Sequence, residues 1–165
     1  MMPQIRPAGP DDAETLDRLI RELAAYEKLE ADVQATPELL RKYLFGPHHC
    51  IEALVAEQNG EAVGFALYFF NFSTFRCLPG LYLEDIYVKP EFRGQGLGTA
   101  LFRRLAAVAM DRGCGRLEWS VLDWNEPAIG FYQSLGARAM DEWTIHRLEG
   151  EPLERLARLN PESAT

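Results

Sequence analysis

Three glycines at alternate positions, Gly94, Gly96 and Gly98, stand between an apolar stretch and a long helical pattern. Glycine loses more conformational freedom on folding than any other residue, so three of them indicate a tight turn or a close approach to the main chain. A strand, a glycine loop and a helix start together expose main-chain N–H groups at the positive end of the helix dipole. The stretch therefore predicts a phosphate cradle, with a tight turn that holds no ligand as the alternative.

The residue types around these glycines discriminate between three phosphate-binding patterns. A Walker loop ends in Gly-Lys-Ser/Thr, whereas this loop reads Gly-Leu-Gly-Thr and has no lysine. The dinucleotide pattern needs a glycine at its sixth position, and counting from Gly94 that position is Thr99. The pattern Arg/Gln-x-x-Gly-x-Gly/Ala is satisfied by Arg93, Gly96 and Gly98. We therefore favour a pyrophosphate cradle of the third kind.

Two adjacent carboxylates, Glu84 and Asp85, interrupt the apolar strand pattern that runs directly into the glycine loop. Successive strand residues point to opposite faces, so at least one carboxylate is expected on the packed side of the sheet or in a cleft. Burying an unpaired carboxylate is costly, which favours a functional site over a pair neutralised by a local arginine or placed at the sheet edge. Such carboxylates can hold a cationic amine and accept its proton.

The composition limits the classes of protein to consider. A chain of 165 residues with 47% hydrophobic and 25% charged residues is expected to fold as one soluble globular protein with a buried core. Its formal net charge of -8 and pI of about 4.9 disfavour nucleic-acid binding, which needs a basic surface. The same charge suits small cationic ligands, although an acidic surface that only keeps the protein soluble is the alternative.

Cysteine and histidine positions give no sign of a metal site or of a disulfide framework. The three cysteines are odd in number, and neither they nor the histidines show metal-ligand spacing. No signal-peptide core and no membrane-spanning stretch is apparent. We therefore expect no metal, no membrane association and a cytoplasmic location. The three cysteines and three histidines are Cys50, Cys77, Cys114, His48, His49 and His146.

The elements that position these residues are predicted from periodicity and turn residues. Strand patterns cover residues 4–6, 51–57, 61–72, 81–88, 116–122 and 142–148, and Asn59-Gly60 predicts a hairpin turn. Helical patterns cover residues 9–29, capped by Asp11 or Asp12, then the stretch from the glycine loop to Gly113, and residues 125–137. A short helix is predicted after Thr36-Pro37.

Antiparallel hairpins followed by a strand–helix–strand unit predict an α/β fold with a parallel strand pair around one crossover. We expect a single domain over residues 1–150, and a tail or short helix over residues 151–165.

The glycine loop and the segment before it, LEDIYVKPEF, carry a resemblance to a known family. The chain resembles the GNAT superfamily of acetyl-CoA-dependent N-acetyltransferases and, through LYLED and WNEPAI, its spermidine/spermine (diamine) acetyltransferase family. The segments STF and LEDIYV are most similar to the thialysine-acetylating branch of that family. The resemblance implies the GNAT fold, a mixed twisted sheet of six to seven strands with a central splayed parallel pair and flanking helices. It also implies a homodimer.

The activity implied by the resemblance is transfer of the acetyl group of acetyl-CoA to a primary amine of a small basic substrate by direct attack. Glu84 matches a candidate proton acceptor, Val88 offers the N–H that polarises the carbonyl, and Tyr132 matches the general acid that protonates the CoA sulfur. The positions that match acetyl-CoA contacts are Ile86, Tyr87, Val88, Arg93, Gly94, Gln95, Gly96, Leu97, Gly98, Thr99, Asn125, Glu126, Pro127, Ala128 and Tyr132.

The substrate amine is expected between carboxylates and aromatic rings. The matching positions are Tyr26, Glu27, Glu84, Asp85, Glu118, Trp119, Ser120 and Asp141. Polyamine-acetylating members carry an acidic residue and a tryptophan where this chain has Thr74 and Arg76. A cation there opposes a long polycation and suits a substrate that also carries a carboxylate, such as a lysine-like thioether amine.

Two other functions remain open from the sequence. Acetylation of a protein or peptide amine needs an open groove in place of an enclosed acidic pocket. A CoA-binding module without catalysis needs neither Glu84 nor Tyr132, so the presence of both favours an enzyme.

Overall fold

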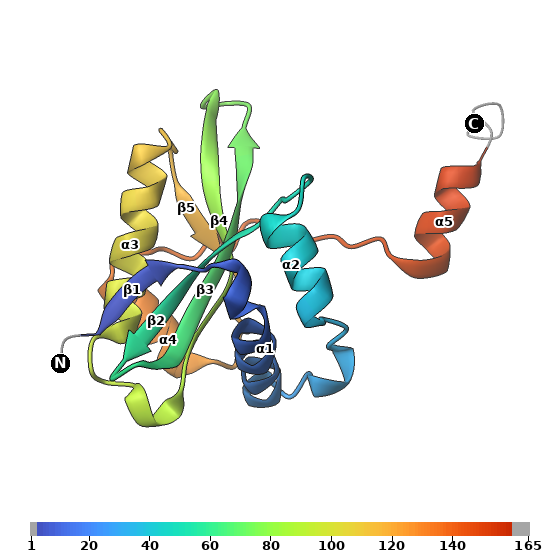
Figure 1. The fold of residues 1–165 in the computed structure, drawn as a ribbon. Helices are drawn as coiled ribbons and strands as arrows, with labels where there is room; N and C mark the ends of the chain where they lie inside the picture. Colours follow the sequence, from blue (N-terminus) through green and yellow to red (C-terminus); the bar gives the residue numbers. More distant parts are fainter. Residues whose placement is uncertain (1–2, 160–165) are drawn as a thin grey trace. The chain divides into compact units, whose positions relative to one another are not determined.

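A computed structural model describes residues 3–159 of the chain (Figure 1). These residues form two compact units, one that ends at Ser120 and one that begins at Val121. The larger unit holds a single sheet, and the smaller one holds two helices.

The sheet has five strands in the order β1-β2-β3-β4-β5. All neighbours are antiparallel except β4 and β5, which are parallel and are joined by the crossover helix α3 (Leu97–Asp111). The predicted α/β class, the hairpins and the parallel pair are therefore confirmed, but the strand number is lower than the six to seven expected. The strands are β1 (Gln4–Pro7), β2 (Glu52–Gln58), β3 (Glu61–Ser73), β4 (Leu78–Val88) and β5 (Leu117–Trp119).

Turn and capping residues set two element boundaries as predicted, whereas the side chain of Asp12, a predicted cap, does not cap the helix that follows it. Asn59 and Gly60 adopt positive φ angles of 54° and 80° and turn β2 into β3. In helix α2 (Pro37–Phe45), the Oγ1 of Thr36 accepts a hydrogen bond from the N–H of Leu39 at 3.2 Å. Short 3-10 turns flank the helices at Pro10–Asp12, Glu30–Asp32 and Pro90–Phe92.

Helix α1 (Ala13–Glu27) and α2 cover one face of the sheet (Figure 1). Their apolar stripes pack against alternate strand residues, among them Val55, Phe65 and Leu67. Positions of the opposite parity, such as Leu54 and Tyr68, share a cavity lining with residues of α3. The sheet is therefore covered on both faces, as a strand–helix–strand crossover requires.

The smaller unit contains α4 (Glu126–Ser134) and α5 (Gly150–Arg158). The strand predicted over residues 142–148 is wrong for this chain, because the structure places no strand there. An alternating pattern gives strand propensity, but a strand also needs a neighbouring edge to pair its N–H and C=O groups. Trp143 and Ile145 in this segment are about three-quarters exposed, at 76% and 75%.

Candidate active site

The glycine loop forms the N-terminal end of α3 with its main chain exposed. Gly94 and Gly96 have positive φ angles of 74° and 84°, and a Cβ built on either would meet no atom within 4 Å. Their glycine identity is therefore required by backbone conformation and not by crowding within the chain. Gly96 is the N-cap and offers no side chain to the first-turn N–H groups, and that turn holds no acidic residue. These residues fit a pyrophosphate group.

A β-bulge interrupts β4 at Glu84. Leu67 pairs with Asp85 whereas its neighbour Tyr68 pairs with Leu83, so Glu84 is the extra residue. The shift breaks the strict alternation from which opposite faces were predicted for the two carboxylates. Asp85 now shares a face with Leu67, on the side covered by α1, and Glu84 is exposed. The bulge therefore re-aims Asp85 toward the end of α1.

β4 separates from its parallel neighbour just beyond this point. The pairing of β4 with β5 ends at Leu83 and Trp119, although β4 continues to Val88. The main chain of Ile86 to Val88 therefore has no strand partner on the β5 side in the described part of the chain. The amide groups of the CoA pantetheine arm can form hydrogen bonds with such an edge, as the resemblance predicts for these residues.

The end of α1 brings predicted substrate and cofactor residues together. The guanidinium of Arg93 lies 4.8 Å from the ring centre of Tyr26 and 5.7 Å from that of Tyr87, which are cation–π distances. Its Nε also donates to the carbonyl oxygen of Val88 at 2.8 Å. Arg93 thus joins α1, the end of β4 and the glycine loop.

Two carboxylates in this region, Asp85 and Glu27, have raised pKa values. Burial raises the pKa of Asp85 to about 6, with smaller contributions from the negative charges of Glu84 and Glu27. Burial also raises the pKa of Glu27. The described residues form no ion pair with Glu27, Glu84 or Asp85. This acidic cluster is therefore suited to receive a cation.

On β5, the predicted substrate residues face two different ways. The carboxylate of Glu118 pairs with Arg116 at 2.8 Å, and the hydroxyl of Ser120 lies 2.8 Å from that of Tyr82. The ring of Trp119 instead stacks edge-on against Phe102 of α3, at 4.8 Å between ring centres. Trp119 therefore packs against the crossover helix, on the other face from Glu118 and Ser120.

The remaining predicted residues lie in the smaller unit. The Oδ1 of the buried Asn125 caps α4 by accepting from the N–H of Ala128 at 3.4 Å, and Glu126 and Pro127 open the helix. Tyr132 is half-buried on α4 beside Phe131, with ring centres 5.7 Å apart. Asp141, the last of the predicted substrate-binding residues, is exposed in a turn.

Arg76 does not reach the acidic cluster of its own chain. Its Nη1 donates to the carbonyl of Gly115 at 2.5 Å, and the Gly115 N–H in turn bonds to Pro79 at 2.8 Å. Glu84 lies five residues along the strand from Pro79, a rise of about 16 Å. The pairing of Arg76 with a substrate carboxylate therefore stays a prediction, since within residues 3–159 the Arg76 guanidinium contacts the carbonyl of Gly115.

Glu22 is a residue of this region that sequence reasoning missed. Its carboxylate accepts a hydrogen bond from the Tyr87 hydroxyl at 3.3 Å and thereby ties α1 to β4. The signal for it was its spacing, because Glu22 and Tyr26 lie four residues apart on one face of α1. No group of three His, Cys, Asp or Glu side chains within residues 3–159 is arranged to hold a metal ion.

The chain matches known proteins over most of its length. Residues 16–137 match the acetyltransferase (GNAT) family. The thialysine N-epsilon-acetyltransferase of Bos taurus is 44% identical over 164 residues, covering 93% of this chain and 96% of the relative. The protein of the same name from Caenorhabditis elegans is 36% identical over 151 residues, covering 90% and 92%.

A solved structure supports the same conclusion. The integron cassette protein VCH_CASS6 from V. cholerae superposes with a TM-score of 0.80 at 29% identity, covering 96% of this chain and 99% of its own. The family match and the relatives agree with the glycine loop and the opened strand pair. The chain therefore belongs to the acetyltransferase (GNAT) family and is an amine N-acetyltransferase.

Proposed function

We propose that this enzyme moves the acetyl group of acetyl-CoA to the primary amine of a small basic substrate, by direct attack of the amine. The observation that carries the proposal is the acidic cluster of Glu27, Glu84 and Asp85 near the glycine loop, because none of these carboxylates forms an ion pair within residues 3–159. The names of the mammalian and nematode relatives favour a thialysine-like amino acid over a long polyamine. Diamines remain the second substrate class to test.

The acidic cluster supplies the acid–base chemistry that the amine requires. An alkylammonium has a pKa near ~10.4, so the enzyme must remove a proton before the nitrogen can attack. Glu84 is the proposed proton acceptor, directly or through water, and Asp85 holds the cation. With a pKa of about 6, Asp85 is ionised at neutral pH and is also basic enough to share this role.

The remaining groups act on the acetyl donor. The Val88 N–H donates to the thioester carbonyl oxygen, where negative charge develops during attack. The N–H groups at the start of α3 and the Arg93 guanidinium hold the pyrophosphate. Tyr132 gives its phenolic proton to the departing CoA thiolate, which leaves acetylated amine and CoA as products; this role rests on the family resemblance.

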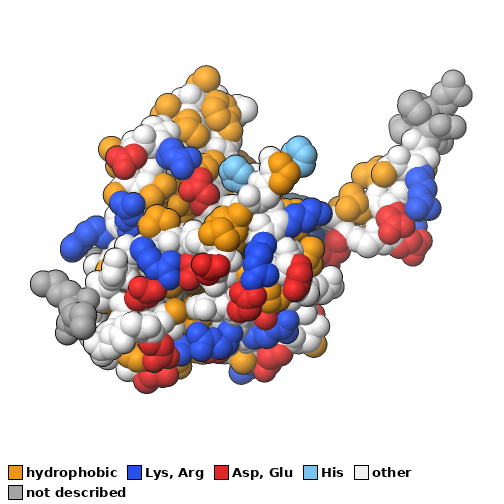
Figure 2. Space-filling model, in the orientation of Figure 1, with side chains coloured by type: hydrophobic (Ala, Val, Ile, Leu, Met, Phe, Trp, Pro, Cys, Tyr) orange, Lys and Arg blue, Asp and Glu red, His pale blue; other side chains and the backbone are white. Residues whose placement is uncertain are grey.

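Assembly and location belong to the same proposal. Exposed apolar side chains at Phe72, Phe75, Trp143 and Ile145 favour a homodimer, since surfaces of this kind mark interfaces. All three cysteines are free thiols, which favours the cytoplasm. Acidic and basic side chains alternate over the face drawn in Figure 2, without the basic stripe of a nucleic-acid binder. No helix within residues 3–159 is long and apolar enough to cross a bilayer.

The test is CoA release from acetyl-CoA against a panel of amines. The panel holds thialysine, lysine, putrescine, spermidine, spermine and a lysine peptide. Turnover of thialysine or short diamines with little turnover of spermine is the expected result. Turnover confined to the peptide would move the enzyme to the protein-acetylating class.

The Tyr132→Phe variant tests the general acid. We expect kcat to fall by roughly 100-fold or more, because general acid–base catalysis contributes about 10²–10⁴-fold, with acetyl-CoA affinity unchanged by calorimetry. Phe131→Tyr keeps the neighbouring ring and serves as the control. Unchanged turnover in Tyr132→Phe would remove this residue from the mechanism.

A further inference from the structure

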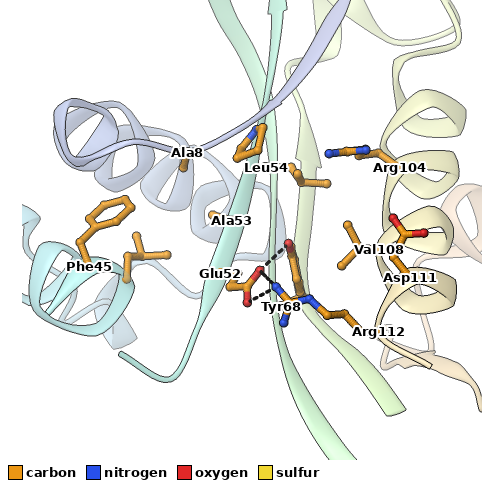
Figure 3. A pocket seen from close by; sticks show the side chains of 12 residues that line it. Ala8, Phe45, Glu52, Ala53, Leu54, Tyr68, Arg104, Val108, Asp111 and Arg112 are labelled. Carbon is orange, nitrogen blue, oxygen red and sulfur yellow. Dashed lines mark hydrogen bonds and ion pairs between the residues drawn. The ribbon is translucent and has the colours of Figure 1, made fainter. Parts of the chain in front are cut away.

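A cavity of about 310 Å³ lies in the larger unit, away from the residues assigned to acetyl transfer (Figure 3). Its walls come from the end of β1, the end of α2, the start of β2, Tyr68 in the second half of β3, and the second half of α3. It begins where β1 ends at Pro7, which leaves the first residue of β2 without a partner on that side. Its volume is in the lower range for small-molecule sites.

The cavity is separate from the glycine loop. Val108, which lines it, lies 11 residues along α3 from Leu97, a rise of about 16 Å. None of the residues assigned to acetyl-CoA or to the amine lines it. Whatever binds there is therefore a different ligand or a second copy of the same one.

One polar network inside the cavity is already satisfied. The Glu52 carboxylate accepts from the Tyr68 hydroxyl at 3.0 Å and from Nη2 of Arg112 at 3.1 Å. Arg112 also lies over the ring of Phe70 at 5.0 Å. Burial raises the pKa of Tyr68, as does the Glu52 charge, so its hydroxyl stays a donor to that carboxylate. These groups offer a fixed, internally neutralised wall.

Two opposite charges remain unpaired. Arg104 and Asp111 form no ion pair or hydrogen bond within the described part of the chain. They lie seven residues apart on α3, with Val108 between them, so all three occupy one face of the helix. In Figure 3 this face is turned toward Leu54 and Tyr68. The guanidinium can accept a carboxylate, and the Asp111 carboxylate can accept an ammonium group.

The rest of the lining is apolar. Leu44, Phe45, Leu54 and Val108 supply its large apolar side chains. The four charged groups sum to zero, because Glu52 and Asp111 balance Arg104 and Arg112. A bare carboxylate would meet Asp111 without compensation, and a bare amine would meet Arg104 in the same way. A neutral zwitterion with an apolar body satisfies both.

We infer that this cavity binds a free amino acid with an apolar side chain, its carboxylate on Arg104 and its ammonium on Asp111. The apolar side chain lies against Leu54 and Val108. The site is a binding site only, without chemistry of its own, and does not depend on the substrate proposed for transfer.

Titration calorimetry on the full chain tests this with L-leucine as the probe. Saturable binding is expected, and two analogues should bind roughly tenfold more weakly or worse, since each lacks one charge-assisted hydrogen-bonding group. 4-Methylpentanoate lacks the ammonium, and 3-methylbutylamine lacks the carboxylate. Equal binding of either analogue would overturn the zwitterion assignment, and absence of saturable leucine binding would overturn the site.

Matched variants test the residues. Arg104→Gln and Asp111→Asn should each weaken leucine binding roughly tenfold or more. Arg103→Gln and Asp32→Asn make the same charge changes at exposed positions outside the cavity and should leave binding unchanged. Circular dichroism checks that all four variants fold.

Amide chemical shifts separate this cavity from the active site. Leucine should shift residues 52–54 and 104–112. Shifts confined to residues 84–99 would place leucine in the acidic cluster and would overturn the inference.

Discussion

Asp85 is a carboxylate in partly buried, acidic surroundings, whereas aspartate side chains are mostly exposed to solvent. It lies on the face of the sheet covered by α1, and burial raises its pKa to about 6 from an ordinary value of about 3.9. Glu84 and Glu27 add negative charge to the same place. An ammonium group bound here is stabilised by all three carboxylates and offsets the repulsion between their negative charges.

The raised pKa predicts how stability depends on pH. Between pH 4 and 6 the folded chain retains a proton on Asp85 that the unfolded chain has lost, so this residue lowers stability as pH rises to 6 and adds no further change above it. Asp85→Asn should therefore be more stable than the parent at pH 7.5, by roughly 1–3 kcal/mol, with a smaller difference at pH 4.5. Urea unfolding at both pH values measures this.

The control for this experiment is Asp32→Asn, an exposed carboxylate in a 3-10 turn. It should change stability little at either pH. A pH-independent effect of Asp85→Asn would show that the Asp85 pKa is not raised. The same Asp85 variant should raise the KM for the amine, because it removes a negative charge from the cluster.

At the scale of elements, the β3–β4 pair carries the geometry of the site. The bulge at Glu84 re-aims Asp85, and the separation of β4 from β5 exposes the main chain of Ile86 to Val88. Gly64 of β3 is paired with Val88 at the end of this ladder. A Cβ on Gly64 would lie 2.6 Å from the carbonyl oxygen of Tyr87 and 3.3 Å from the Cα of Val88. Glycine is therefore needed here for close approach of two strands.

Gly64→Ala is expected to move β3 away from β4. The overpacking should cost roughly 1–3 kcal/mol, a drop in Tm of several degrees. It should also lower kcat/KM, because the added methyl group meets β4 at Tyr87 and Val88, next to the Val88 N–H proposed to polarise the carbonyl. Thermal unfolding and steady-state kinetics measure the two effects.

Gly130→Ala is the matched control. Gly130 lies within α4, where a Cβ meets no atom within 4 Å, so alanine should leave stability unchanged or raise it by up to about 1 kcal/mol. Equal stability of the Gly64 and Gly130 variants would contradict the close-approach argument.

At the scale of the whole molecule, the apolar side chains left exposed are the feature that needs an explanation. In the smaller unit, Trp143 and Ile145 are about three-quarters exposed, and Leu153 and Leu156 of α5 are about half exposed. The tip of the β3–β4 hairpin exposes Phe72 and Phe75 in the larger unit, at 57% and 101%. Surfaces of this kind are costly in a monomer and are typical of an interface.

The proposed dimer can be tested on the segment that failed to form a strand. Trp143→Ser combined with Ile145→Ser should shift the mass in sedimentation equilibrium from dimer toward monomer at micromolar concentration, because both exposed apolar groups are lost. Thr144→Ser combined with His146→Ser alters the intervening positions and should leave the mass unchanged. A monomeric parent protein would contradict the proposal.

The sequence by itself determined what depends on near neighbours in the chain. Thr36-Pro37 begins α2, Asn59-Gly60 turns the hairpin, and Gly94 and Gly96 shape the loop before α3, because caps, turns and positive φ angles are decided by a few consecutive residues. The same loop identified the family.

Only the tertiary structure decided what depends on pairing between distant segments. The bulge at Glu84 is a matter of register with β3, and the burial of Asp85 depends on α1. The separation of Pro79 from Glu84 follows from the length of β4, and the pattern at residues 142–148 forms no strand because it pairs with no other segment within residues 3–159. Register, burial and strand pairing are set by contacts between segments far apart in the sequence, which local patterns do not specify.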